Sequence, residues 1–180
     1  MTIPWVKRAD KMQALLFYWM QTLDDADRDL SLSWSAMHLY GSAQLAKLLA
    51  LQRGLDADLA ACMGALHDIA TILSKRSKGH AHRAGPYFRQ ILEAYHAQYG
   101  SDENMRVTPE EEALILRAIE QHGDKLEDSG EPYAEMLKDV DVLEHALHGL
   151  DKPDEQARWN RLCQALDLAE PIRKSPEETP

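Results

Sequence analysis

The amino-acid sequence predicts a single all-α domain of about seven helices. Apolar residues recur at intervals of three and four along most of the chain, and no stretch alternates convincingly between apolar and polar residues. The clearest helix boundaries are the capping box from Thr108 to Glu111 and the glycine at Gly123. A chain of 180 residues can bury about two-thirds of its unfolded surface around one core. We therefore expect one domain over residues 1–170, with its motif-bearing core at about 33–147.

Local signals bound the first four expected helices. The first ends where an acidic connector, Asp24 to Asp29, begins, and Gly54 stops the second. Asp56 is placed to cap the third helix, and Pro86 is tolerated in the first turn of the fourth, which ends at Gly100. The four helices are expected over about residues 5–22, 33–52, 56–73 and 84–100.

The last three expected helices have similar boundaries. Thr108 and Gly123 enclose the fifth, Pro132 and Gly149 flank the sixth, and Pro153 opens the seventh. These helices are expected over about residues 108–122, 132–147 and 153–168. The remaining tail, 171–180, is polar and rich in proline, so we expect it to be disordered.

Composition and charge exclude several classes of partner. The formal net charge of −10 repels nucleic-acid polymers and anionic lipid surfaces. The longest unbroken apolar run, Ala14 to Met20, is too short to cross a bilayer, and the first ten residues lack the pattern of a signal peptide. We therefore expect a cytoplasmic protein. Its two cysteines, Cys62 and Cys163, form neither a disulfide framework nor a cysteine metal site.

One segment nevertheless concentrates positive charge. Between Ile69 and Leu92 there is no aspartate or glutamate. A small anionic substrate is compatible with such a segment, because local cations can grip a phosphate and arginine suits a bidentate hold. The candidate phosphate-binding residues are Lys75, Arg76, Lys78 and Arg83.

Several of the eight histidines are predicted to face the interior. His38 shares its helix face with Leu49, and His122 projects from the apolar stripe at the end of its own helix. His67 stands at the edge of a third stripe, next to Asp68 in the chain. Imidazole and carboxylate together are ligands that Zn, Fe and Mn accept, and helical bundles build metal sites from facing helices. Three separate helices thus offer candidate ligands.

These residues occur in a recognisable order. The elements are His38, Leu66-His67-Asp68-Ile69, Gly79-His80-Ala81, Ile119-Glu120-Gln121-His122 and Leu137-Lys138-Asp139-Val140-Asp141-Val142-Leu143. Together they resemble the HD-domain superfamily of metal-dependent phosphohydrolases. The resemblance implies an all-helical domain that binds one divalent ion through His38, His67, Asp68 and the final aspartate. In members with two further histidines these bind a second ion, and the candidates here are His80 and His122.

Two of the implied ligands have competitors. Asp139 and Asp141 lie about 200° apart on a helix, so only one can reach the metal, and the apolar periodicity does not choose between them. The Asp-x-Leu pattern of the family favours Asp141. His80 and His82 also compete, and the family's spacing to the following helix favours His80.

The other polar residues near these motifs receive structural interpretations. We interpret Glu144 as a boundary carboxylate, with a role in orienting a metal ligand as the alternative. The histidines without a partner motif, interpreted as surface or boundary residues, are His96, His145 and His148.

The resemblance implies hydrolysis of a small phosphorylated metabolite or nucleotide, with His67 and Asp68 as the catalytic pair. The metal would be one or two ions of Mn, Fe, Zn, Mg, Co or Ni. The alternatives are a di-iron oxygenase of the same fold and a metal-stabilised regulatory or binding module without turnover. A homo-oligomer is compatible with all three functions.

Features of related subgroups narrow the substrate. The subgroup that hydrolyses cyclic di-GMP carries a Gly-Tyr-Pro element, which this sequence lacks. Bacterial hydrolases of dinucleoside tetraphosphates usually have threonine after the fourth histidine, where this chain has Gly123. The chain most resembles stand-alone bacterial HD proteins of unassigned substrate.

Overall fold

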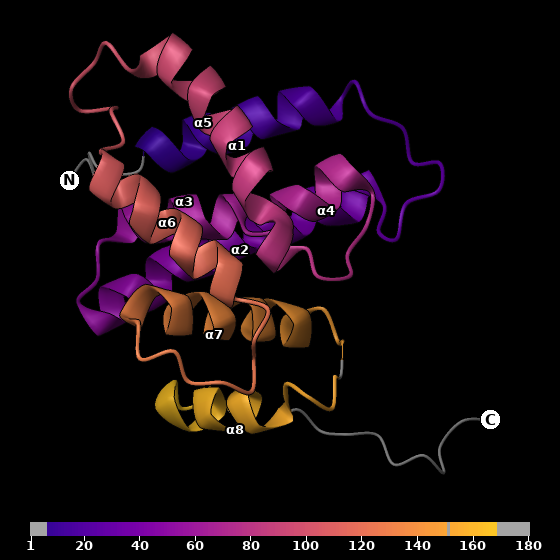
Figure 1. The fold of residues 1–180 in the computed structure, drawn as a ribbon. Helices are drawn as coiled ribbons and strands as arrows, with labels where there is room; N and C mark the ends of the chain where they lie inside the picture. Colours follow the sequence, from indigo (N-terminus) through magenta and orange to yellow (C-terminus); the bar gives the residue numbers. More distant parts are fainter. Residues whose placement is uncertain (1–6, 151, 169–180) are drawn as a thin grey trace.

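The computed structural model describes residues 7–150 and 152–168. Within these residues the secondary structure is helical throughout and contains no strand, so the predicted all-α class is confirmed (Figure 1). The elements are α1 (Lys7–Met20), α2 (Leu32–Arg53), α3 (Ala57–Leu66), α4 (Ile69–Ser74), the 3₁₀ helix η1 (Ala81–Arg83), α5 (Ala84–Tyr99), α6 (Pro109–Gln121), α7 (Pro132–Leu147) and α8 (Gln156–Ala165). The expected helix start at Trp5 and the tail 171–180 lie outside the described residues.

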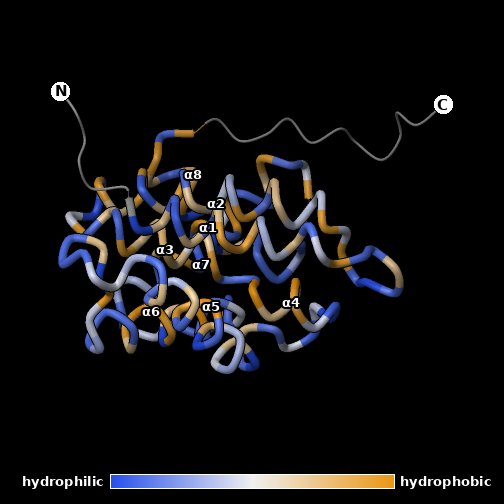
Figure 2. Tube along the Cα trace, turned by 90° about the horizontal axis from the view of Figure 1, so that it is seen from above, coloured by the Kyte–Doolittle hydropathy of each residue, from blue (hydrophilic) through white to orange (hydrophobic). Residues whose placement is uncertain are grey.

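Helix α3 is the centre of the domain, because all ten of its residues are buried. It packs most extensively against α2 and also contacts α1, α6 and α7, while α8 covers the outer side of α7 (Figure 1). Hydrophobic stretches recur along the helices, whereas the peripheral loops are mostly hydrophilic (Figure 2). By length and composition alone the segment 57–74 could cross a membrane, but 83% of it is buried inside the domain. Core packing therefore accounts for its apolar character.

The helix predicted over residues 56–73 is interrupted in the middle. Helix α3 ends before His67, and α4 begins after Asp68, whose φ of −98° and ψ of 16° are not helical. Upstream of the break, Gly64 packs so closely on α2 that a Cβ there would lie 2.7 Å from the carbonyl oxygen of Ser42. A continuous helix would turn His67 and Asp68 about 100° apart. The break instead lets both side chains face the same point.

Most predicted helix boundaries are present. The Thr108 hydroxyl accepts the Glu111 N–H at 3.2 Å, and the Glu111 carboxylate accepts the Thr108 N–H at 2.9 Å, which completes the capping box. The Asp56 carboxylate caps α3, and Gly54 ends α2 with a φ of 67°. Helix α8 begins later than predicted, because residues 153–155 form a turn.

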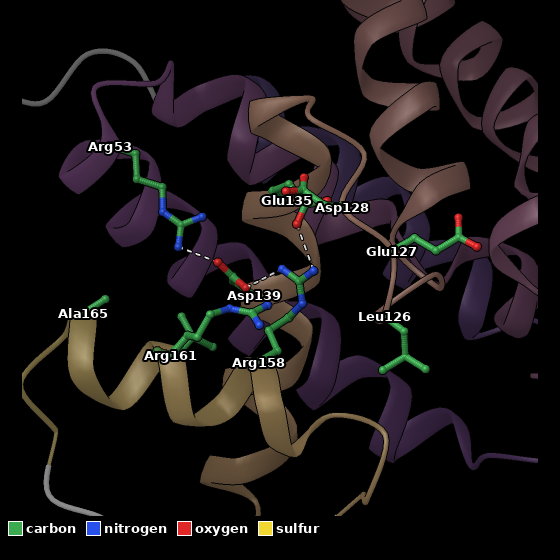
Figure 3. Close-up of a pocket in the computed structure, with 10 residues that line it drawn as sticks. Arg53, Leu126, Glu127, Asp128, Glu135, Asp139, Arg158, Arg161 and Ala165 are labelled. Carbon is green, nitrogen blue, oxygen red and sulfur yellow. Dashed lines mark hydrogen bonds and ion pairs between the residues drawn. The ribbon is translucent and has the colours of Figure 1, made fainter.

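A network of charged side chains fastens α8 to α7 (Figure 3). Arg158 donates to Asp139 at 2.7 Å and to Glu135 at 2.9 Å, and Arg53 donates to the other Asp139 oxygen at 2.6 Å. The fully buried Lys138 donates to Glu135 at 2.8 Å. Each buried charge therefore has a partner of opposite sign, which offsets the cost of removing it from water.

The close approach of α3 to α2 predicts the effect of one substitution. In an ordinary helix interior, glycine to alanine stabilises by about 0.5–1 kcal/mol. We expect Gly64→Ala to destabilise the domain instead, by about 1–3 kcal/mol, because the added methyl group would overlap the α2 backbone. Urea unfolding followed by circular dichroism measures the change. A gain in stability would show that the two helices can separate without cost.

Candidate metal centre

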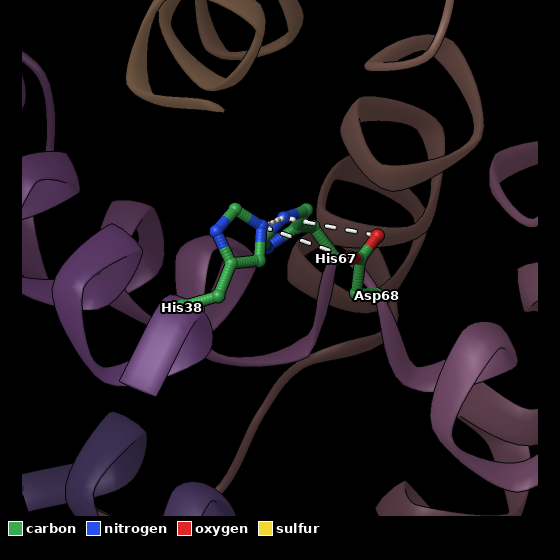
Figure 4. Close-up of side chains that lie close together, drawn as sticks. All are labelled: His38, His67 and Asp68. Atoms are coloured by element: carbon green, nitrogen blue, oxygen red, sulfur yellow. Dashed lines mark hydrogen bonds and ion pairs between the residues drawn. The ribbon is translucent and has the colours of Figure 1, made fainter. Parts of the chain in front are cut away.

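Five separate segments deliver side chains to one buried point. His38 comes from the middle of α2, and His67 and Asp68 come from the junction of α3 and α4. The other three are His80 just before η1, His122 at the end of α6 and Asp141 on α7. We call these six residues the metal cluster. Figure 4 shows the rings of His38 and His67 converging beside the carboxylate of Asp68.

The first half of the metal cluster joins α2, α3 and α7. The Nε2 atom of His38 lies 2.9 Å from Nε2 of His67 and 3.2 Å from a carboxylate oxygen of Asp141. The same oxygen of Asp141 lies 3.6 Å from Nε2 of His67. Asp68 approaches both rings, at 3.6 Å from His38 and 3.8 Å from His67. Four potential ligand atoms therefore surround one position.

The second half of the metal cluster shares Asp68 with the first. Its Oδ1 atom lies 2.7 Å from Nε2 of His80 and 3.7 Å from Nε2 of His122. The two Nε2 atoms are 2.9 Å apart. Asp68, His80 and His122 thus form a second group of mutually close ligand atoms. Asp68 therefore belongs to both groups of potential ligand atoms.

The outer nitrogen of every cluster histidine faces an oxygen acceptor. Nδ1 of His67, His80 and His122 donates to the backbone carbonyl three residues earlier, at 2.9, 2.7 and 2.6 Å. Nδ1 of His38 donates to the Glu144 carboxylate at 2.5 Å. An Nδ1 that carries the proton leaves the lone pair of a neutral imidazole on Nε2. All four rings therefore direct Nε2 into the metal cluster.

This arrangement fits a divalent metal. Two Nε2 atoms face each other at 2.9 Å in His38–His67 and again in His80–His122, so each pair can offer two lone pairs to one cation once both rings are neutral. Imidazole with carboxylate suits Mn, Fe, Zn and related ions. Hydrogen bonds to the outer nitrogens orient such ligands and raise their basicity. The cluster residues can hold a metal, as predicted.

Electrostatics favours the ligating form of Asp68, Asp141 and His122. At His38 and His80 burial lowers the pKa, but neighbouring carboxylates outweigh burial and raise it. Burial alone would raise the pKa of Asp68, but the imidazoles of His67, His122 and His80 outweigh it and hold that pKa well below its usual range. For Asp141 the neighbouring Lys125 has the same effect on the pKa. Burial lowers the pKa of His122 to about 4, so this imidazole is neutral at physiological pH. Ionised carboxylates and neutral imidazoles are the forms that bind metal.

The structure separates both pairs of competing ligands. Asp139 faces Arg53 and Arg158 in the charge network, on a side of α7 that Asp141 does not share. His82 is exposed and lies 3.4 Å from the carboxylate of Asp124, whereas the adjacent turn carries His80 into the metal cluster. Asp141 and His80 are therefore the members that the fold brings together.

Two structural interpretations from the sequence were wrong. His145 is buried rather than superficial: its ring stacks on that of His38 at 5.1 Å, and its Nε2 lies 3.4 Å from Asp141. Glu144 is 2% exposed and accepts the hydrogen bond from His38, so it orients a ligand and is not a boundary carboxylate. Gly41 makes room for it, since a Cβ there would lie 3.1 Å from the Glu144 carboxylate.

The remaining histidines match their interpretation as boundary residues. His96 is partly exposed, 3.8 Å from Glu112. His148 is 39% exposed and lies 2.8 Å from Glu144. For the buried His145, by contrast, the sequence did hold a sign of its proximity to the metal cluster. It stands one helical turn after Asp141, on the same face of α7.

The cations of the basic segment have other partners. Lys75 donates to Asp24 at 2.9 Å, and Arg76 donates to Asp29 at 3.1 Å, so both hold the acidic connector against the end of α4. Arg83 donates to the Ser74 hydroxyl and to nearby backbone carbonyls, and Lys78 is exposed. Their role in substrate binding stays a prediction.

A cavity of about 230 Å³ opens over the metal cluster. Cluster residues form part of its wall, and Lys125 and Lys152 form another part. Lys125 is buried and donates to the Asp141 carboxylate at 2.6 Å. Neither lysine was predicted from the sequence, because both lie in non-helical segments after helices, where apolar periodicity gives no direction to a side chain.

The fold and the metal cluster together define a helical protein whose buried imidazoles and carboxylates could hold divalent metal between its helices. A model of the HD-domain family matches residues 36–153, so the chain belongs to the HD-domain family. The match confirms the resemblance found in the sequence and includes all six cluster residues. It implies a hydrolase-type function that depends on metal. Searches of curated proteins and of solved structures found no match.

The contact between Glu144 and His38 predicts a loss of metal affinity. Glu144→Gln removes the negative charge that polarises His38 while keeping the shape of the side chain. We expect divalent metal to bind about 10–100-fold more weakly, as is typical when the partner of a ligating histidine is changed. Competition with a fluorescent chelator measures the affinity. Glu112→Gln, beside the peripheral His96, is the matched control and should retain the original affinity.

The pKa of His38 predicts how metal binding depends on pH. Burial lowers this pKa, but the Asp141 and Glu144 carboxylates outweigh burial and raise it to about 10. The metal-free His38 therefore carries a proton at neutral pH, and metal must displace it. We expect Mn²⁺ affinity to increase from about pH 6 to about pH 8, with proton release. Calorimetry in two buffers of different ionisation enthalpy measures this, and pH-independent affinity would contradict it.

Proposed function

We propose that this protein hydrolyses a phosphate ester of a small metabolite or nucleotide with the help of one or two divalent ions. The observation that carries the proposal is the convergence of four imidazoles and two carboxylates under a polar cavity. Membership of the HD-domain family supports the same conclusion. The reaction would consume one water, break the ester P–O bond and leave a proton on the departing oxygen.

Each cluster residue has a definite task in this proposal. His38, His67 and Asp141 would hold one ion, and His80 and His122 the other, with Asp68 between them. When bound, such ions activate water and neutralise phosphoryl oxygens. Burial and the backbone hydrogen bonds keep the imidazoles in place, so little rearrangement accompanies the reaction. The protein therefore contributes mainly orientation and charge.

The charge of the molecule favours a small substrate. With a net charge of −10 the protein repels long polyanions, whereas a single phosphate group can be attracted locally by ions and lysines. We infer that the substrate is a freely diffusing cytoplasmic metabolite.

Substitution of the central pair tests the proposed function. We expect His67→Ala and Asp68→Ala to lower metal-dependent hydrolysis at least about 100-fold and to reduce bound metal, because each removes a ligand at the shared centre. A phosphatase screen with Mn²⁺, Mg²⁺, Co²⁺ and Ni²⁺ measures the activity, and elemental analysis measures the metal. The helical circular-dichroism signal should survive. His82→Ala, an exposed histidine outside the cluster, should behave like the wild type.

Other outcomes favour the alternative functions. Undiminished turnover in either central variant would refute the assignment of the site. A coloured, iron-loaded protein that consumes oxygen would favour the oxygenase function. A protein that holds stoichiometric metal but hydrolyses none of the esters screened would favour a regulatory module.

A further inference from the structure

The metal cluster faces a cavity whose other wall the family motifs do not explain. We propose that Lys125 and Lys152 bind the phosphoryl group of the substrate in this cavity, and that the substrate is a compact phosphomonoester. This inference rests on the proposed function and names its substrate class. Among the described residues, these two lysines are the only lysines or arginines that line the cavity.

Lys125 combines burial with a spare hydrogen-bond donor. Its ammonium group donates to the His122 carbonyl at 2.7 Å and to Oδ2 of Asp141 at 2.6 Å. A lysine has three N–H donors, so one remains for a ligand in the cavity that Lys125 lines. The contact with Oδ2 also turns Oδ1 of Asp141 toward His38, 3.2 Å away. Lys125 therefore positions a cluster carboxylate and presents charge beside it.

Lys152 supplies the second positive charge on the lining of the cavity. Its Nζ lies 3.0 Å from Nδ1 of His145 and 3.5 Å from Glu155, and its side chain is 43% exposed. A partly exposed ammonium on this wall can meet an incoming anion before the anion reaches the metal cluster. The family match ends at residue 153, so Glu155 and α8 behind it lie outside that match.

A single arginine ties the two lysine-bearing segments together. Arg158 on α8 donates to the backbone carbonyl of Lys125 at 3.2 and 3.3 Å. The same guanidinium is held by Asp139 and Glu135 on α7. The guanidinium of Arg158 thus fixes the turn that carries Lys125 to the start of α8, which follows Lys152. A prearranged pair of cations costs less to order when a ligand binds.

The cavity also limits the kind of anion that fits. Sites for drug-sized ligands typically enclose about 300–1,000 Å³, whereas this cavity encloses about 230 Å³. Asp154 and Glu155 line it as well. A second or third phosphate would bring further negative charge against these carboxylates, which costs free energy. Size and charge therefore favour a monoester with a small organic group over dinucleoside polyphosphates.

Binding of inorganic phosphate tests the lysines without relying on turnover. The full chain is loaded with Mn²⁺, its metal content is measured, and phosphate is titrated by calorimetry. We expect Lys152→Met to weaken phosphate binding about 10–100-fold, because it removes a charge-assisted hydrogen bond. Lys152→Arg should retain most of the affinity. The matched control is Lys47→Met on α2, outside the cavity, which should leave the affinity unchanged.

Two results would overturn the assignment. The first is wild-type phosphate affinity in a fully metal-loaded Lys152→Met variant. Lys125→Met should weaken phosphate binding similarly, and its metal content shows whether the Asp141 contact also contributes. The second result combines two measurements: phosphate binding is weaker in a variant with alanine at Lys75, Arg76, Lys78 and Arg83 together, and it is normal in Lys152→Met. That combination would place the phosphate site in the basic segment.

The substrate class has its own measurement, distinct from that of the proposed function. We expect kcat/KM for small phosphomonoesters to exceed that for dinucleoside tetraphosphates at least about tenfold, and the reverse order would refute the compact-substrate inference. A metal-loaded protein that hydrolyses neither class, yet loses phosphate affinity in Lys152→Met, would refute the proposed hydrolase and support the lysine site.

Discussion

The structure depends on how the outer nitrogen of each cluster histidine is held. Rings that could rotate freely would not keep their Nε2 atoms opposed at 2.9 Å. His67, His80 and His122 solve this in the same way, because each bonds to the carbonyl three residues earlier. At helix ends and turns such carbonyls lack the regular partner four residues later, although those of Ser77 and Ile119 also accept the backbone N–H of the same histidine. His67 and His122 therefore stand where helices stop, His80 stands in the turn before η1, and the break between α3 and α4 is part of the site.

The outer nitrogen of His38 is held in a different way. It lies in the middle of α2, where the backbone carbonyls are already engaged, so it needs an acceptor from another helix. Glu144 on α7 supplies that acceptor, and Gly41 leaves room for it. This explains why Glu144 is only 2% exposed in the folded chain, although the apolar pattern of the sequence places it near the edge of the helix face. Its surroundings come from another helix, which no local spacing encodes.

The sequence predicted well what depends on neighbours along the chain. Helical periodicity, the capping box at Thr108 and the stop at Gly54 are local features, and all are present. The order of the HD motifs was also readable, since it is a property of the sequence itself. What escaped depends on contacts between distant segments. Apolar periodicity did not separate Asp139 from Asp141, whereas the arginines of α2 and α8 hold Asp139 away from the metal cluster. Lys75, a predicted phosphate-binding residue, instead pairs with Asp24 of the acidic connector.

The six cluster residues are spread from position 38 to position 141, which has a consequence during synthesis on the ribosome. His38, His67 and Asp68 leave the exit tunnel long before Asp141, and the nascent chain has no complete coordination sphere until α7 has emerged. Any ion taken up earlier would have to be held by fewer ligands. Full occupancy of the centre therefore requires that synthesis has passed α7, and a chain that stops before Asp141 would lack one of the six side chains.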